Sequence, residues 1–115
     1  MRYHGGCHCG KVQFDVDVDL SNPITCNCSY CSQRGSILAF TPESSFTLEK
    51  GSDDLTEYLF NTRKISHLFC ADCGMESFAR AAGPDGTRMV AVNVRCLEGV
   101  DLDGLSPQQF DGRSR

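Results

Sequence analysis

Cysteine content is the feature that most constrains how this chain can fold: eight cysteines lie within 115 residues, and seven of them fall into three tight groups. The groups are Cys7-His8-Cys9, Cys26-Asn27-Cys28-Ser29-Tyr30-Cys31 and Cys70-Ala71-Asp72-Cys73, while Cys96 stands alone. Cysteines one or two residues apart suit a metal ion held by two thiolates from one turn better than they suit cross-chain disulfides. The spacing therefore predicts metal sites.

Structural disulfides and redox chemistry are the two alternatives for these thiols. Residues 1–5 are polar and do not form a secretory signal, so we expect a reducing cytoplasmic compartment, where structural disulfides are rare. A redox C-x-x-C motif opens a helix in a βαβ unit, whereas Cys73 is followed directly by Gly74 and then by a strand-like stretch. Both observations favour metal binding.

A glycine directly follows the last cysteine of the first and third groups, at Gly10 and Gly74. Glycine adopts positive φ without steric cost, so the chain can curl there and direct backbone N–H groups at the thiolate sulfurs. This shared feature predicts one closed site of four thiolates, which is the arrangement typical of structural zinc. Its ligands would be Cys7, Cys9, Cys70 and Cys73. Such a site would contribute to the folding free energy of a small domain.

The middle group, Cys26, Cys28 and Cys31, offers three thiolates within six residues. Three protein ligands with an open fourth position are typical of catalytic zinc, whereas structural zinc has four protein ligands. The alternative is therefore a second structural site that a residue from elsewhere completes. Candidates for that fourth ligand are Cys96, His67, His8 and His4. We expect two zinc ions per chain.

Charge and hydropathy exclude several classes of partner. The chain carries 15 acidic and 11 basic residues, a formal charge of −4, and has no Lys/Arg cluster. We therefore expect no binding to nucleic acid. The longest apolar runs, such as residues 37–40 and 89–92, are far shorter than the roughly 20 residues of a membrane span, so we expect no membrane association. The length predicts a single domain over residues 1–115.

Residues 12–20 alternate apolar and polar side chains, which predicts a strand with one buried face. The run Asp15-Val16-Asp17-Val18-Asp19 superficially resembles a calcium loop, but it lacks the required glycine, so we interpret its aspartates as a solvated strand face. Further strands are predicted at residues 36–40, 45–49, 56–61, 66–69, 77–80 and 88–94. Short helices are predicted at residues 30–34 and 107–110. The pattern indicates a small, mainly antiparallel β domain.

Four motifs in fixed order give the chain a family resemblance. They are GCHCGKVQF at residues 6–14, CNCSYC at 26–31, HLFCADCG at 67–74 and VNVRCL at 92–97, with FDGR at 110–113 closing the chain. Together they resemble the glutathione-dependent formaldehyde-activating enzyme family over nearly the whole chain. The resemblance implies a mainly β fold called the β-tent, in which two antiparallel β-sheets meet over zinc knuckles.

The resemblance also implies roles for the cysteines. It makes Cys7, Cys9, Cys70 and Cys73 the structural zinc ligands, in agreement with the pairing based on glycine. It makes Cys26, Cys28 and Cys31 the ligands of a catalytic zinc. The implied activity is that of a carbon–sulfur lyase acting on glutathione, or another thiol, and its adducts with small aldehydes, such as S-hydroxymethylglutathione. A non-catalytic zinc-binding module that binds a metabolite or a protein, and a zinc-buffering or redox-responsive protein, are the alternatives.

Three further features bear on such a site. Seven ligating thiolates contribute −7 and two Zn²⁺ ions +4, which takes the formal charge from −4 to −7. An anionic substrate would then need cations, for which the candidates are Arg34, Arg63, Lys64, Arg80 and Arg95. His67 is a candidate proton shuttle or, alternatively, a packing residue. Cys96 is a buried apolar-type residue, a fourth ligand or a substrate-site thiol. Ser29 and Ser32 are expected to hydrogen-bond the thiolates.

Overall fold

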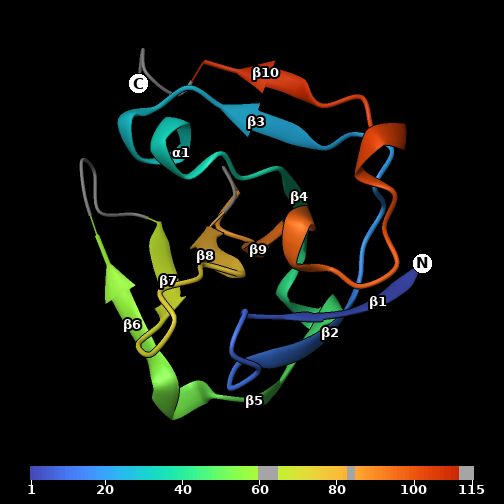
Figure 1. Cartoon of the computed structure of the whole chain (residues 1–115). Coiled ribbons are helices and arrows are strands. Elements are labelled where there is room, and N and C mark those ends of the chain that lie inside the picture. Colours follow the sequence, from blue (N-terminus) through green and yellow to red (C-terminus); the bar gives the residue numbers. More distant parts are fainter. Residues whose placement is uncertain (60–64, 83–84, 112–115) are drawn as a thin grey trace.

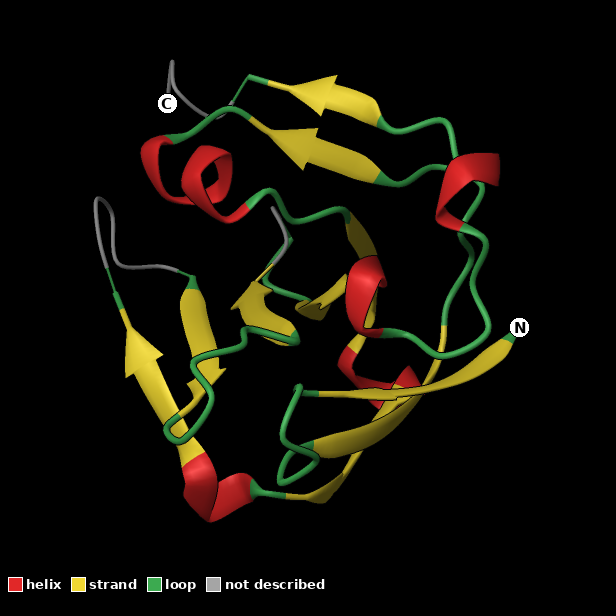
Figure 2. Cartoon of the chain, viewed as in Figure 1, coloured by secondary structure: helices red, strands yellow, loops and turns green. Residues whose placement is uncertain are grey.

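The computed structural model describes residues 1–59, 65–82 and 85–111. Strands form most of its regular structure and belong to two sheets, which Figures 1 and 2 show facing each other at an angle. This arrangement agrees with the mainly β, two-sheet fold predicted from the sequence. Among the described residues, no helix has the length and apolar character that crossing a membrane requires.

The smaller sheet, as far as residues 1–59, 65–82 and 85–111 show it, has three antiparallel strands in the order β1-β2-β5. They are β1 (Arg2–Gly6), β2 (Gln13–Asp17) and β5 (Phe46–Lys50). Along β2, Phe14 and Val16 are fully buried while Asp17 is exposed. The alternation therefore confirms the predicted strand with one face in the core.

In the part of the chain that the structure describes, the larger sheet has seven strands in the order β10-β3-β4-β9-β8-β7-β6. They are β3 (Ile24–Cys26), β4 (Leu38–Pro42), β6 (Leu55–Tyr58), β7 (Ser66–Cys70), β8 (Phe78–Ala82), β9 (Arg88–Asn93) and β10 (Gln108–Phe110). β3 pairs with β4 at Ile24 and Leu38. β3 and β10 form the edge of this sheet at the top of Figure 1.

Short helices connect the strands. The helix α1 (Ser29–Arg34) lies between β3 and β4 in the chain, where a short helix was predicted. Within the described residues, four 3₁₀ turns occupy other connections: η1 (Glu43–Ser45), η2 (Ser52–Asp54), η3 (Val94–Cys96) and η4 (Leu102–Gly104). All the described helices are therefore short, as expected.

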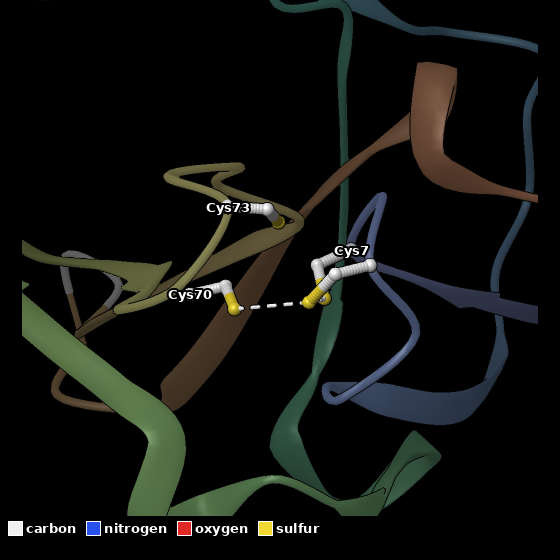
Figure 3. A group of neighbouring side chains, drawn as sticks. Cys7, Cys70 and Cys73 are labelled. Carbon is white, nitrogen blue, oxygen red and sulfur yellow. Dashed lines mark hydrogen bonds between the residues drawn. The ribbon is translucent and has the colours of Figure 1, made fainter.

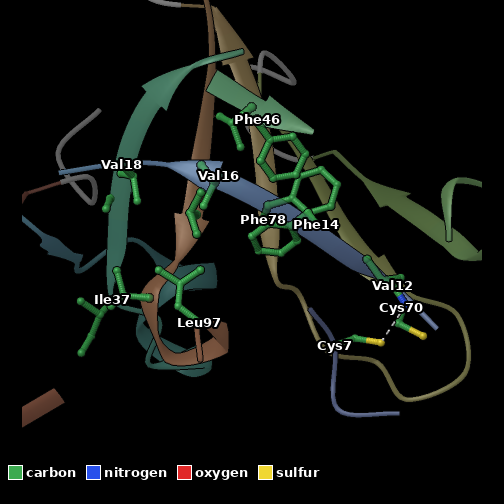
Figure 4. Close-up of a cluster of buried hydrophobic side chains, with 14 residues drawn as sticks. Cys7, Val12, Phe14, Val16, Val18, Ile37, Phe46, Cys70, Phe78 and Leu97 are labelled. Atoms are coloured by element: carbon green, nitrogen blue, oxygen red, sulfur yellow. Dashed lines mark hydrogen bonds between the residues drawn. The ribbon is translucent and has the colours of Figure 1, made fainter. Parts of the chain in front are cut away.

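The two sheets share one hydrophobic core, centred on three phenylalanines (Figure 4). The ring centroid of Phe14, from the smaller sheet, lies 4.9 Å from that of Phe46 and 5.8 Å from that of Phe78, which belongs to the larger sheet. Cys7 and Cys70 lie at one end of this core. The core thus brings together the two chain segments that carry the first and third cysteine groups.

One helix prediction is wrong. Residues 107–110 were expected to be helical, but Gln108–Phe110 is β10, which pairs in parallel with β3. The backbone N–H of Gln108 donates to the carbonyl of Pro23 at 2.9 Å, so pairing with a distant segment outweighs the local helical preference. The sequence also gave no prediction for β1 or β3, and part of the predicted strand 56–61 lies outside the described residues.

Candidate metal centres

The first cluster consists of Cys7, Cys9, Cys70 and Cys73, whose four sulfurs all lie within 4.8 Å of one another. Cys7 and Cys9 belong to the turn between β1 and β2. Cys70 ends β7, and Cys73 lies in the turn that follows (Figure 3). The Sγ atom of Cys9 is 3.6 Å from that of Cys7 and 3.6 Å from that of Cys70. The structure therefore brings together the four thiols that the sequence assigned to one site.

The two glycines beside this cluster have the backbone conformation that the sequence predicted. Gly10 has φ of 84° and Gly74 has φ of 77°. The N–H of Gly74 donates to the carbonyl of Cys70 at 2.8 Å and closes the turn. A Cβ added at Gly74 would meet no described atom within 4 Å, so its conformation, and not a lack of space, is what requires glycine.

Backbone N–H groups point at the sulfurs of this cluster. The N–H of Val12 donates to the Sγ of Cys7 at 3.3 Å. Against the effect of desolvation, the N–H groups of Cys9 and Met75 lower the pKa of Cys73 to about 6. Although the Lys11 N–H acts to lower it, desolvation and the neighbouring thiols raise the pKa of Cys9 to about 12.

Neighbouring thiols that shift each other's pKa in opposite directions cannot all ionise at neutral pH unless a cation shares their charge. A soft divalent ion would supply that charge, and thiolate ligands select zinc or similar soft metals. The donor chemistry of the first cluster therefore fits a metal ion.

The second cluster, Cys26, Cys28 and Cys31, comes from a single short segment. Cys26 ends β3, Cys28 is the N-cap of α1, and Cys31 lies within that helix. Their three sulfurs lie within 4.8 Å of one another, and all three residues are half-buried. The Cys28 Sγ accepts a hydrogen bond from the Cys31 N–H at 3.3 Å, so the start of the helix fixes this sulfur.

The electrostatics of the second cluster resemble those of the first. Against the effect of desolvation, hydrogen bonds from the Cys31 N–H and from the neighbouring thiols lower the pKa of Cys28. Burial, followed by the adjacent thiols, raises the pKa of Cys31. This donor set also fits a soft divalent ion. Among the described residues, the group of metal-ligating atoms at this place contains these three thiols and no fourth member.

Cys96 shares a cavity with Cys7 of the first cluster. It ends η3 and lines a cavity of about 430 Å³ together with Cys7 and His8. Burial, and then the charges of Cys7 and Cys73, raise the pKa of its thiol to about 11. The structure therefore does not place Cys96 with the second cluster.

His67 is buried in a network that sequence reasoning did not find. Its side chain is 7% exposed, and its Nδ1 lies 3.2 Å from the Oε2 of Glu76, which is equally buried. The Tyr30 hydroxyl donates to the other carboxylate oxygen of Glu76, and the Tyr30 ring lies 4.3 Å from the His67 ring, centroid to centroid. These contacts connect His67 to α1. No local pattern could have revealed them, because Tyr30 and Glu76 are 46 residues apart.

His4 belongs to a third, more exposed group with Asp15 and Glu49 on the outward face of the smaller sheet. Its Nδ1 lies 2.9 Å from the Oδ1 of Asp15, and His4 and Asp15 are opposite each other on β1 and β2. This bond raises the pKa of His4. We interpret the group as a surface ion cluster, in keeping with the solvated face predicted for β2.

The basic residues predicted to contact an anionic substrate, and the serines predicted to contact the thiolates, do not gather at one place in the described structure. Arg63 and Lys64 lie outside the described residues. Arg80 pairs with Glu43, at 3.4 Å between Nη1 and Oε2. The Arg95 Nε donates to the carbonyl of Gly35, the C-cap residue of α1, at 3.2 Å. The Ser32 hydroxyl donates to the Ser29 carbonyl at 3.3 Å. Of the basic candidates for contact with a substrate, Arg34 is the one that lies on α1 with the second cluster.

The fold and these clusters define a protein of two β-sheets with two candidate thiolate metal centres. The chain belongs to the glutathione-dependent formaldehyde-activating enzyme family, whose sequence pattern matches residues 2–110. A Rhodobacter sphaeroides protein of known crystal structure is similar to it, with a TM-score of 0.81 and 33% sequence identity over 95% of this chain and 98% of that one.

Proposed function

We propose that this protein is a zinc-dependent carbon–sulfur lyase that acts on glutathione, or a related thiol, and its adducts with small aldehydes such as S-hydroxymethylglutathione. The observation that carries the proposal is the second cluster: three half-buried thiols, fixed by the start of a helix, with no fourth ligand beside them among the described residues. Three protein ligands are typical of catalytic zinc. Membership of the family supports a glutathione-related substrate.

In this proposal Cys7, Cys9, Cys70 and Cys73 would hold a structural zinc. A second zinc would be held by Cys26, Cys28 and Cys31. When bound at the second site, zinc would supply acidity to an incoming thiol and hold it as the thiolate. The need for reduced thiols at both sites supports function in the cytoplasm.

The proposed chemistry is reversible addition of a thiolate to an aldehyde. The thiolate sulfur forms a bond to the carbonyl carbon, the π electrons move to the oxygen, and the oxygen takes up one proton. In reverse, the oxygen loses that proton and the C–S bond breaks. As ligands of the second zinc, Cys26, Cys28 and Cys31 would determine where the incoming sulfur is held, so the gain in rate would come mainly from orientation.

His67 would act through α1 and not on substrate. Its side chain is 7% exposed and is held between Glu76 and Tyr30. A proton shuttle must reach the reacting oxygen directly or through one water. The burial of His67 therefore supports the packing alternative over the shuttle.

Zinc content and formaldehyde consumption test the proposal in one preparation. The wild-type protein should hold nearly two zinc ions per chain and consume formaldehyde only with a thiol present. Cys28→Ser should lose one zinc ion and the activity while it stays folded. Cys96→Ser makes the same chemical change outside both clusters. This variant should keep both its zinc content and its activity.

Two results would contradict the proposal. A fully zinc-loaded protein that consumes no formaldehyde with any thiol would favour the non-catalytic binding module. A Cys28→Ser protein that unfolds as completely as Cys70→Ser would show that the second site is structural.

A further inference from the structure

A cavity of about 320 Å³ lies beside the helix that carries the second cluster. Ligand-binding pockets typically measure about 300–1,000 Å³. One wall is α1, and the other comes from Tyr58 on β6 and Phe69 on β7. The residues that line it are Ser29, Tyr30, Gln33, Arg34, Tyr58 and Phe69.

The cavity combines aromatic walls with one fixed positive charge. The rings of Tyr30 and Tyr58 stack, with 5.4 Å between their centroids. The Arg34 guanidinium lies over the Tyr30 ring at 5.3 Å and over the Phe69 ring at 5.8 Å. Its Nη1 donates to the Gly74 carbonyl at 2.9 Å. Stacking, this bond and a hydrogen bond with the Tyr30 hydroxyl hold the guanidinium in place. A guanidinium has five N–H donors, so further donors remain for a ligand.

Arg34 differs from most of the described basic residues in its partners. Arg2, Lys11, Arg80 and Arg88 each lie against a carboxylate. Among the described residues, the partners of Arg34 are the Gly74 carbonyl, two aromatic rings and the Tyr30 hydroxyl, and none of them is a carboxylate. Its charge is therefore available to an anion that enters the cavity.

The positive charge of Arg34 would offset the negative charge of a zinc-loaded second cluster. Three thiolates and one Zn²⁺ leave a formal charge of about −1 there, so an incoming anionic thiol is repelled. Arg34 follows Cys31 by three residues, less than one helical turn. Ser29, at the edge of the cavity, directly follows Cys28. A substrate could thus place its sulfur at the cluster and a carboxylate in the cavity.

We propose that this cavity binds the carboxylate-bearing part of the thiol substrate, with Arg34 as the residue that selects it. A guanidinium binds a carboxylate through two parallel hydrogen bonds, and the aromatic walls would pack against the adjoining peptide atoms. The protein would therefore prefer peptide thiols with a free carboxylate over small neutral thiols. This inference deepens the proposed function and, in its catalytic consequence, rests on it.

A ligand that cannot use its sulfur separates the cavity from the metal. S-methylglutathione has no thiol to ionise, and its binding to the zinc-loaded protein can be measured by calorimetry. Because hydrogen bonds to charged groups are among the stronger ones, Arg34→Gln should weaken this binding about tenfold or more. Arg88→Gln, which changes an exposed arginine on β9, should leave it unchanged. The diester of S-methylglutathione should bind wild type as weakly as the free acid binds Arg34→Gln.

Steady-state kinetics give a second readout. Arg34→Gln should raise KM for glutathione about tenfold with kcat little changed, because a contact made equally in the ground and transition states affects binding alone. KM for the neutral thiol 2-mercaptoethanol should not change. Tyr58→Ala, which truncates a half-exposed wall residue, should also weaken S-methylglutathione binding. This variant tests the cavity if Arg34→Gln does not fold.

The outcomes separate this inference from the proposed function. If S-methylglutathione binds Arg34→Gln and Tyr58→Ala as tightly as wild type while zinc content is unchanged, the inference is overturned and the proposed function stands. If binding requires Arg34 but no thiol supports formaldehyde consumption, the cavity assignment stands and the proposed function fails.

Discussion

The two cysteine clusters offer the same donor atoms but bring together very different lengths of chain. The first joins residues that are 61 positions apart, such as Cys9 and Cys70, and its Cys70 is fully buried at the end of the hydrophobic core. The second comes from six consecutive residues, and all of its cysteines are half-buried. The contrast teaches that loop length and burial, more than ligand type, decide what a thiolate site does for a fold.

The physical reason is the entropy of loop closure. Closing a long loop removes more freedom from the unfolded chain than closing a short one, so a link across 61 positions constrains the whole fold. A link within six residues constrains little more than the start of α1. We therefore expect stability to depend on the first cluster and activity on the second.

The largest expected effect is that of breaking the first cluster. Cys70→Ser should lower the free energy of unfolding by at least about 4 kcal/mol, because structural zinc contributes to folding directly and small domains have only about 5–15 kcal/mol to lose. Cys28→Ser should cost less than about 2 kcal/mol. Chemical denaturation in the presence of excess zinc measures both. Equal losses would remove the distinction between the clusters.

Chelation should separate the same two sites without mutation. A chelator of graded strength is expected to remove one zinc ion while the protein stays folded, and to remove the other only together with unfolding. A colorimetric zinc indicator measures metal release, and circular dichroism of the same sample measures unfolding. Release of both ions in a single step that coincides with unfolding would contradict the comparison.

Removal of the buried carboxylate beneath α1 should have an intermediate effect. Glu76→Ala leaves His67 and the Tyr30 hydroxyl without this partner, which should cost about 1–3 kcal/mol of stability. Because Tyr30 lies between Cys28 and Cys31, the affinity of the second site for zinc should fall more than that of the first. Competition titrations with a zinc indicator test this order of losses. Tyr30→Phe removes one hydroxyl only. It should also lower the zinc affinity of the second site more than that of the first, but by a smaller amount.

The smallest expected effect concerns the turn of the first cluster. Gly74→Ala should destabilise the protein by about 1–2 kcal/mol, the cost of a left-handed conformation for a residue with a Cβ. Ser32→Ala, a comparable change beside the second cluster, removes only an exposed hydrogen bond to a carbonyl and should stay within about 0.5 kcal/mol. Thermal unfolding of the two variants tests the difference.

Features written in short stretches of sequence were predictable. The alternation around Phe14 and Val16 predicted β2, and the glycines after Cys9 and Cys73 predicted the positive φ values and the grouping of four thiols. Each of these follows from residues within a few positions of one another, where conformational preference and spacing act directly.

Features that depend on distant partners were not predictable. The strand at Gln108–Phe110 forms because it pairs with β3, more than eighty positions earlier in the chain. The contact of Tyr30 with Glu76, and the cavity that Arg34 lines with Tyr58, likewise join segments that only the folded chain brings together. Local propensity carries no information on such contacts.

The parallel pairing of β10 with β3 sets an order for events on the ribosome. The thiols of the second cluster are synthesised before Cys70 and Cys73, but the strand that flanks them receives its partner β10 only when residues 108–110 have been made. The ligands of the first cluster are complete once residue 73 has emerged. Because synthesis proceeds from the N-terminus, the proposed structural zinc could be captured on the nascent chain before β10 has been made, whereas the environment of the other three thiols is completed only after β10 pairs with β3.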